Sequence, residues 1–117
     1  MLSKPEKDTL VQAVYEIVSR IPYGRITSYG AIAAAVGYPN LSRMVGQIMK
    51  GSGDYKEKLP CHRVVNSQGY LSGKDSFDHS GQMQQLLEAE GIIVVNNKIK
   101  NHKEIFWDPM EEILFDK

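Results

Sequence analysis

Three short helical patterns fill the first fifty residues, and they limit the possible folds more than any other feature of the chain. In the first pattern, Ser3 and Glu6 have the spacing of a capping box, and apolar residues then recur at helical spacing until Pro22 and Gly24. We therefore expect an amphipathic helix that ends before Pro22. Its apolar face consists of Leu10, Val11, Val14, Ile17, Val18 and Ile21.

Two more short helices are expected between residues 28 and 51. Ser28 can cap an alanine-rich helix in the stretch YGAIAAAVG, which Gly37 should end. After the turn GYPN, Ser42 can cap a third helix, SRMVGQIMKG. Two short helices joined by a tight turn resemble a helix-turn-helix motif.

The third helical pattern separates into two faces of different character. Gly46, on the polar face, weakens a helix interior by ~1 kcal/mol relative to alanine, which favours close approach by another macromolecule. Chance and an ordinary solvated face are the alternatives. The apolar face consists of Met44, Val45, Ile48 and Met49, and the polar face of Arg43, Gly46, Gln47 and Lys50.

The second half of the chain reads as shorter elements. Pro60 excludes a helix in LPCHRVV, so this stretch is expected to be a short strand or turn. It is followed by a turn in NSQG and an irregular segment in KDSFDHSG. A helix is expected through QMQQLLEAEG, then a hairpin in IIVVNNKIK around Asn96 and Asn97. Phe106 and Trp107 are expected to anchor the core. The fold class is therefore mainly α with a small β component.

Composition narrows the class of protein. The 117 residues suit one domain, 1–117, and the single cysteine excludes an intramolecular disulfide scaffold. The sequence contains no C-x-x-C pair that could form a zinc site. The first residues are charged, unlike a signal peptide, and no apolar run has membrane-spanning length, so we expect a cytoplasmic protein without membrane contact. Because Lys plus Arg equal Asp plus Glu, 14 against 14, any DNA binding must come from a local patch.

Cys61 is either a nucleophile or a small buried apolar residue. His62 is adjacent, but neighbouring side chains on an extended segment point to opposite faces, so cooperation would need a bridging water or a turned backbone. Glu90 shares a helical face with Met83 and Leu87 and should therefore be buried with a partner. Glu90 could orient His62 in a proton relay to Cys61, or the two could form an ordinary hydrogen bond.

The order of these motifs resembles the C-terminal domain of the O6-alkylguanine-DNA alkyltransferases. The matching segments are SYGAIAAAVG, SRMVGQIMKG, PCHRVV, LSG and LLEAEG, and they cover roughly residues 8 to 95. The resemblance implies a winged helix-turn-helix domain that binds the DNA minor groove as a monomer without a cofactor. It also implies that the domain rotates an O6-alkylguanine out of the duplex and takes its alkyl group irreversibly.

Carried over by position, the resemblance assigns roles to individual residues. Cys61 would accept the alkyl group, with His62 and Glu90 as the proton relay. Tyr29 would crowd the target phosphate, and Arg43 would fill the vacated base stack. Gly46, Gln47 and Lys50 would complete the DNA-binding face, and Ser52, Val64, Ser72 and Gly73 would line the base pocket.

The sequence also departs from that family. Nothing resembling the family's N-terminal domain or its metal site precedes the first helix, Ser52 stands where asparagine is usual, and KDSFDHSGQMQQ replaces a basic and aromatic segment. In these departures the chain resembles the single-domain alkyltransferase-like proteins. Those proteins flip alkylated bases and recruit nucleotide excision repair proteins without removing the alkyl group. That branch typically carries tryptophan where this chain has Cys61. We expect direct repair, with recognition alone as the alternative, and a helix-turn-helix transcription factor as a third reading that leaves PCHR unexplained.

Overall fold

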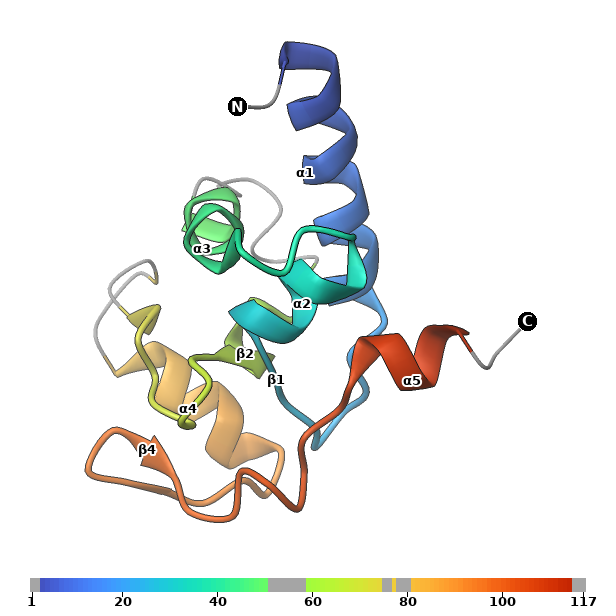
Figure 1. Cartoon of the computed structure of the whole chain (residues 1–117). Helices are drawn as coiled ribbons and strands as arrows, with labels where there is room; N and C mark the ends of the chain where they lie inside the picture. Colours follow the sequence, from blue (N-terminus) through green and yellow to red (C-terminus); the bar gives the residue numbers. More distant parts are fainter. Residues whose placement is uncertain (1–2, 51–58, 75–76, 78–80, 115–117) are drawn as a thin grey trace.

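The computed structural model describes residues 3–50, 59–74, 77 and 81–114. Within these ranges the chain is mainly helical with two small sheets, as expected from the sequence, and Figure 1 shows one pair of short strands among the helices and β4 at the edge. The helices are α1 (Lys4–Ser19), α2 (Tyr29–Ala35), α3 (Ser42–Lys50), the 3-10 helix η2 (Cys61–Arg63), α4 (Gln82–Ala89) and α5 (Pro109–Leu114). The strands are β1 (Thr27–Ser28), β2 (Val64–Val65), β3 (Val94–Val95) and β4 (Lys98–Ile99).

Helix α1 begins and ends as its sequence predicts. The Ser3 hydroxyl accepts a hydrogen bond from the Glu6 backbone N–H, and the Glu6 carboxylate accepts one from the Ser3 N–H, so the capping box is complete. The helix ends at Ser19, before Pro22. Its buried residues are Leu10, Val14, Ile17 and Val18.

Helices α2 and α3 form the expected helix-turn-helix and pack against each other and against α1 (Figure 1). Ser28 caps α2, because its hydroxyl accepts a hydrogen bond from the Ala31 backbone N–H. Gly37 has a φ of 93°, a left-handed conformation that favours glycine just after a helix. Ser42 is the first residue of α3 rather than the residue before it, so the expected cap lies one position too late.

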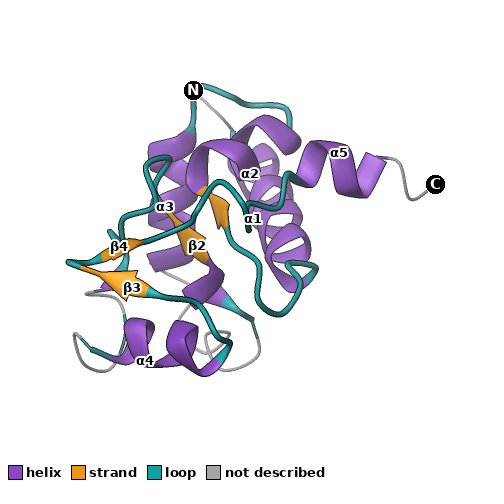
Figure 2. Ribbon diagram, turned by 90° about the horizontal axis from the view of Figure 1, so that it is seen from below, coloured by secondary structure: helices purple, strands orange, loops and turns teal. Residues whose placement is uncertain are grey.

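The small sheets hold the helices in register. Strands β1 and β2 are parallel, with Thr27 opposite Val64 and Ser28 opposite Val65, so the start of α2 lies beside the end of η2. Strands β3 and β4 form the predicted antiparallel hairpin, visible from below in Figure 2. Asn96 and Asn97 turn it with φ values of 52° and 67°, which asparagine tolerates well.

Two hydrophobic clusters support the fold. One lies among α1, α2 and α3 and contains Cys61 and Trp107, and the other joins α4 to the β3–β4 hairpin. The prediction for Phe106 was wrong, because Phe106 is only half-buried and belongs to neither cluster. It forms an extended backbone bridge with Ile26, and in extended chain successive side chains alternate sides, so Trp107 takes the inward position.

Among the described residues, no helix combines the length and the apolar character that crossing a bilayer requires.

Candidate functional site

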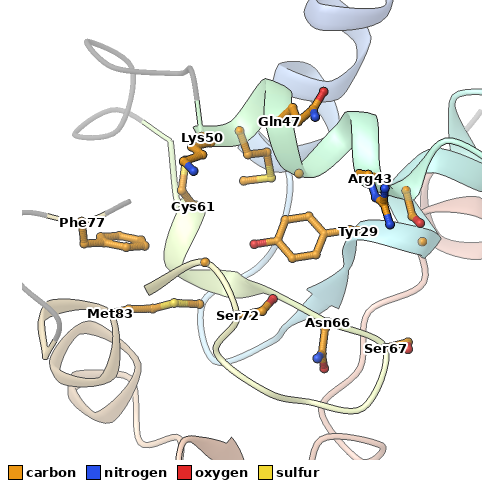
Figure 3. Close-up of a pocket in the computed structure, with 15 residues that line it drawn as sticks. Tyr29, Arg43, Gln47, Lys50, Cys61, Asn66, Ser67, Ser72, Phe77 and Met83 are labelled. Carbon is orange, nitrogen blue, oxygen red and sulfur yellow. The ribbon is translucent and has the colours of Figure 1, made fainter. Parts of the chain in front are cut away.

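A cavity of about 650 Å³ opens between the helix-turn-helix and the segment 66–73, large enough for a small-molecule-sized group (Figure 3). Helices α2 and α3 supply one side of it, and Met83 of α4 reaches it from another. The lining residues are Tyr29, Gly30, Ser42, Arg43, Gly46, Gln47, Met49, Lys50, Cys61, Asn66, Ser67, Ser72, Gly73, Phe77 and Met83.

Cys61 borders this cavity although it belongs to the hydrophobic core. The residue is 8% exposed and is packed in the cluster that includes Val64. It begins η2, where its backbone N–H donates to the Leu59 carbonyl. The thiol therefore lies where the core meets the cavity wall, so a ligand in the cavity would face it.

His62 makes the contact expected with Glu90. Its Nε2 lies 2.6 Å from a Glu90 carboxylate oxygen, and the two side chains are only 14% and 6% exposed. Cys61 and His62 occupy a 3-10 turn instead of an extended strand, which is the turned backbone that cooperation between neighbouring residues requires. His62 does not line the cavity itself.

The Glu90 carboxylate also binds two groups that sequence analysis missed. Arg63 Nε lies 3.0 and 2.9 Å from its two oxygens, and the Gly24 backbone N–H donates to one of them at 2.6 Å. Burial raises the pKa of Glu90, but the hydrogen bonds from Arg63, His62 and Gly24 outweigh it and hold that pKa below its usual range. The carboxylate is therefore ionised at neutral pH. The arginine directly after His62 was the feature that could have indicated this partner.

Tyr29 extends across the middle of the cavity (Figure 3). Burial raises the pKa of the Tyr29 phenol, the hydrogen bond with the Ser72 side chain lowers it, and the nearby Cys61 raises it further, leaving it above the usual range. Two glycines leave room for the ring: a Cβ on Gly73 would lie 2.5 Å from the Tyr29 hydroxyl, and one on Gly46 would lie 3.8 Å from the ring. The phenol is thus neutral and closely enclosed.

The exposed face of α3 forms one rim of the cavity. Arg43, Gln47 and Lys50 are exposed and Gly46 is half-buried, as the helical pattern predicts, while Val45, Ile48 and Met49 are buried beneath. All four polar-face residues border the cavity. A basic and polar helix face therefore lies next to the cavity that contains the thiol.

The expected base-pocket residues have different positions. Ser72 and Gly73 line the cavity, whereas Val64 is fully buried in the core and does not. Ser52 lies outside the described residues. Val64 instead packs into the hydrophobic cluster among α1, α2 and α3.

Part of the cavity lining was not predicted from the sequence. Asn66 accepts hydrogen bonds from the Gln68 and Tyr70 N–H groups and so fixes the turn that carries Ser67 into the lining. Its position at the start of the expected turn NSQG was the available indication. Phe77 and Met83 lie in KDSFDHSGQMQQ, which differs from the family's usual segment, so only their apolar character pointed to them.

In the described part of the chain, no cluster of histidine, cysteine, aspartate and glutamate could hold a metal ion.

Comparisons with known proteins agree with this geometry. Alkyltransferase-like protein 1 of Schizosaccharomyces pombe is 36% identical over 106 residues, which are 87% of this chain and 97% of the relative. A DNA base-flipping protein of Escherichia coli is 40% identical over 76% of this chain and 67% of its own length. A constitutive methylated-DNA–protein-cysteine methyltransferase of Bacillus subtilis is 47% identical, but over 53% of this chain and 37% of its own length.

Solved structures give the same grouping. The S. pombe Atl1 complex with damaged DNA containing O6-carboxymethylguanine matches with a TM-score of 0.75 and 37% identity, over 87% of this chain and 97% of that one. The Mycobacterium tuberculosis OGT complex with DNA matches with a TM-score of 0.59 and 34% identity, over 68% and 48%. Residues 9–92 match the family described as the DNA-binding domain of 6-O-methylguanine DNA methyltransferase, and the chain belongs to that family.

Proposed function

We propose that this protein repairs alkylated DNA by binding a duplex that contains O6-alkylguanine, flipping the damaged base into the cavity and transferring its alkyl group to Cys61. The observation that carries the proposal is the position of Cys61 in the wall of the same cavity that Tyr29 and Arg43 border. A buried thiol without a role would not need to face a cavity rimmed by a basic helix. The protein would act as a monomer without a metal or cofactor.

The DNA-binding roles follow from the rim. The net charge is zero, so attraction to phosphates must come from local cations such as Arg43 and Lys50. Arg43 would fill the stack that the flipped base leaves, and Tyr29 would crowd the target phosphate. Gly46 would let α3 approach the minor groove closely. Extrusion costs a few kcal/mol, least for a badly paired base, and this favours an alkylated guanine.

The transfer is a displacement at the alkyl carbon. The Cys61 sulfur forms a bond to that carbon while the bond from carbon to guanine O6 breaks, and the electron pair of that bond stays with the base. His62 would take the thiol proton through a water molecule and return a proton to the departing guanine, so the products are a thioether and unmodified guanine. The ionised Glu90 would stabilise the protonated His62.

Recognition without transfer is the second candidate. It is favoured by the similarity to the S. pombe relative, which is named an alkyltransferase-like protein. The match covers nearly the whole length of that relative. In that case the chain would flip the alkylated base and present the complex to nucleotide excision repair proteins. The same cavity and rim would serve both functions, and only the fate of the alkyl group separates them.

Intact-mass measurement after incubation with an O6-methylguanine duplex tests the choice. Transfer adds one methyl group per protein, confined to the peptide that contains Cys61, and restores guanine in the oligonucleotide. Cys61→Ala should bind the lesion and leave it intact, and Cys61→Trp should behave as a recognition protein. Tight binding by the parent protein with no change in mass over hours would replace transfer by recognition.

A further inference from the structure

The turn 66–70 forms part of the cavity wall, because Asn66 and Ser67 both line the cavity. Asn66 also holds this turn together from within, since its side-chain oxygen accepts the Gln68 N–H at 3.0 Å and the Tyr70 N–H at 2.9 Å. A group that shifts the turn therefore shifts the wall as well.

The β3–β4 hairpin is bonded to the same turn, although none of the hairpin's described residues lines the cavity. The Ile99 N–H donates to the Gly69 carbonyl at 2.9 Å, and the Leu71 N–H donates to the Asn97 carbonyl at 3.0 Å. Figure 1 shows β4 beside the segment that follows β2. The position of the wall thus depends on a part of the chain outside the cavity.

His102, three residues after β4, packs directly against Gly69. Gly69 has a φ of 89°, and a Cβ built on it would lie 2.8 Å from His102 Cγ, closer than such contacts occur, and 3.0 Å from His102 Nδ1. The imidazole ring therefore occupies the space in which a side chain at residue 69 would begin. His102 is half-buried in this position.

We infer that His102 is a positioning residue for the lesion cavity, because its ring fixes the turn 66–70 and with it the wall that Asn66 and Ser67 form. The inference rests on the proposed lesion binding but not on alkyl transfer. Glycine has the widest conformational freedom of any residue, so Gly69 needs an external support to hold one conformation. A wall that is already ordered binds a flipped base without a further cost of ordering.

The preference for a lesion separates this role from a general effect on folding. Two duplexes of one sequence would be compared, one with O6-methylguanine and one undamaged, by fluorescence anisotropy at one salt concentration. Cys61→Ser is the background, so that no transfer occurs. A charge effect of His102 on DNA phosphates, or partial unfolding, weakens binding of both duplexes equally and cancels in the ratio of the two dissociation constants.

We expect His102→Ala to lower the preference for the lesion on the order of fivefold, the cost of ordering one or two side chains at an interface. His102→Phe keeps a flat ring against Gly69 and should restore most of the preference. Lys103→Gln changes the next residue, which is exposed, and should leave the preference unchanged.

A second background tests whether His102 acts through the turn. Asn66→Ala removes the hydrogen bonds that hold the turn together, so His102→Ala should lower the preference little further when added to it. An unchanged preference in His102→Ala, or an equal loss with and without Asn66→Ala, would overturn the inference while leaving the proposed lesion binding in place. If the Cys61→Ser protein itself shows no preference for the lesion, the proposed lesion binding is rejected, and this inference with it.

Discussion

Gly73 and Tyr29 can lie as close as they do only because residue 73 has no side chain. A Cβ on residue 73 would be 2.5 Å from the Tyr29 hydroxyl oxygen, closer than such contacts occur, whereas the ring carbon that bears the hydroxyl would be 3.9 Å away. The conflict therefore concerns one oxygen atom. Gly73 lets that hydroxyl stay beside Ser72 in the middle of the cavity.

Gly73→Ala should displace Tyr29 and weaken binding of a lesion duplex about tenfold or more, at a stability cost of about 1–3 kcal/mol typical of overpacking. Tyr29→Phe removes the oxygen in conflict, so adding Gly73→Ala to Tyr29→Phe should cost little further stability. Thermal denaturation of the four proteins measures this coupling. Equal costs of Gly73→Ala in the two backgrounds would mean that the hydroxyl is not the obstacle.

Gly46→Ala should separate stability from DNA binding. A Cβ at residue 46 would make ordinary contact with the Tyr29 ring at 3.8 Å, so the free protein should gain about 1 kcal/mol from the better helix propensity of alanine. Binding to duplex DNA should weaken nonetheless, because the added methyl group lies on the face that we propose approaches the groove. Unchanged affinity in a titration would argue against close docking of α3.

Arg43→Ala should lose most of the preference for lesion-containing duplex over undamaged duplex while keeping the fold. The buried side of α3, which includes Val45 and Ile48, is untouched by this substitution. The measurement is the pair of dissociation constants at one salt concentration, with circular dichroism as the check on folding. If mutant and parent prefer the lesion equally, Arg43 does not fill the vacated stack.

Glu90→Gln should remove an acid-sensitive part of the stability. The pKa of Glu90 is lowered in the folded protein, so its contribution is present above the unfolded-state pKa of about 4.3 and is lost as pH falls through the lower folded-state value. Near pH 7 the substitution leaves Arg63 without its charge partner and should cost about 3 kcal/mol. Urea denaturation from pH 7 downward should show the gap between mutant and parent narrowing below about pH 4.

The same variant tests the proposed proton relay. Without the carboxylate, His62 loses the negatively charged group that holds its ring in place, and Cys61 should react more slowly with iodoacetamide at neutral pH. Lys103→Gln, far from this contact in the sequence and exposed, serves as the control. An unchanged rate in Glu90→Gln would remove Glu90 from the relay while leaving its structural role.

The helical half of the fold could be predicted because each helix carries its own start, stop and apolar spacing. The helix signals at Ser3, Ser28 and Gly37 involve residues only a few positions away, so they can be predicted from the sequence alone. Glu90 was also predictable, since an acidic residue in line with Met83 and Leu87 on a helix needs a buried partner.

The contacts that were missed join distant segments. Arg63 and Gly24 both donate hydrogen bonds to the Glu90 carboxylate from separate parts of the chain, and no local sequence pattern predicts this contact. The environment of Phe106 depends on a backbone bridge to Ile26. Val64 was placed in the base pocket by its position in the motif PCHRVV, and an apolar run alone does not show which strand residue faces a cavity.

The long reach of the contacts around Cys61 has a consequence for the timing of synthesis. His62 meets Glu90 across 28 positions, and Arg25 at the start of the helix-turn-helix segment bonds the Ile105 carbonyl across 80. Contacts between distant positions form late and slow folding, because the intervening chain must first be closed into loops. A nascent chain that has left the ribosome only as far as α4 lacks the residues that fix both η2 and the entry to α2. The thiol and the start of α2 therefore reach their final arrangement only after residue 105 has been made.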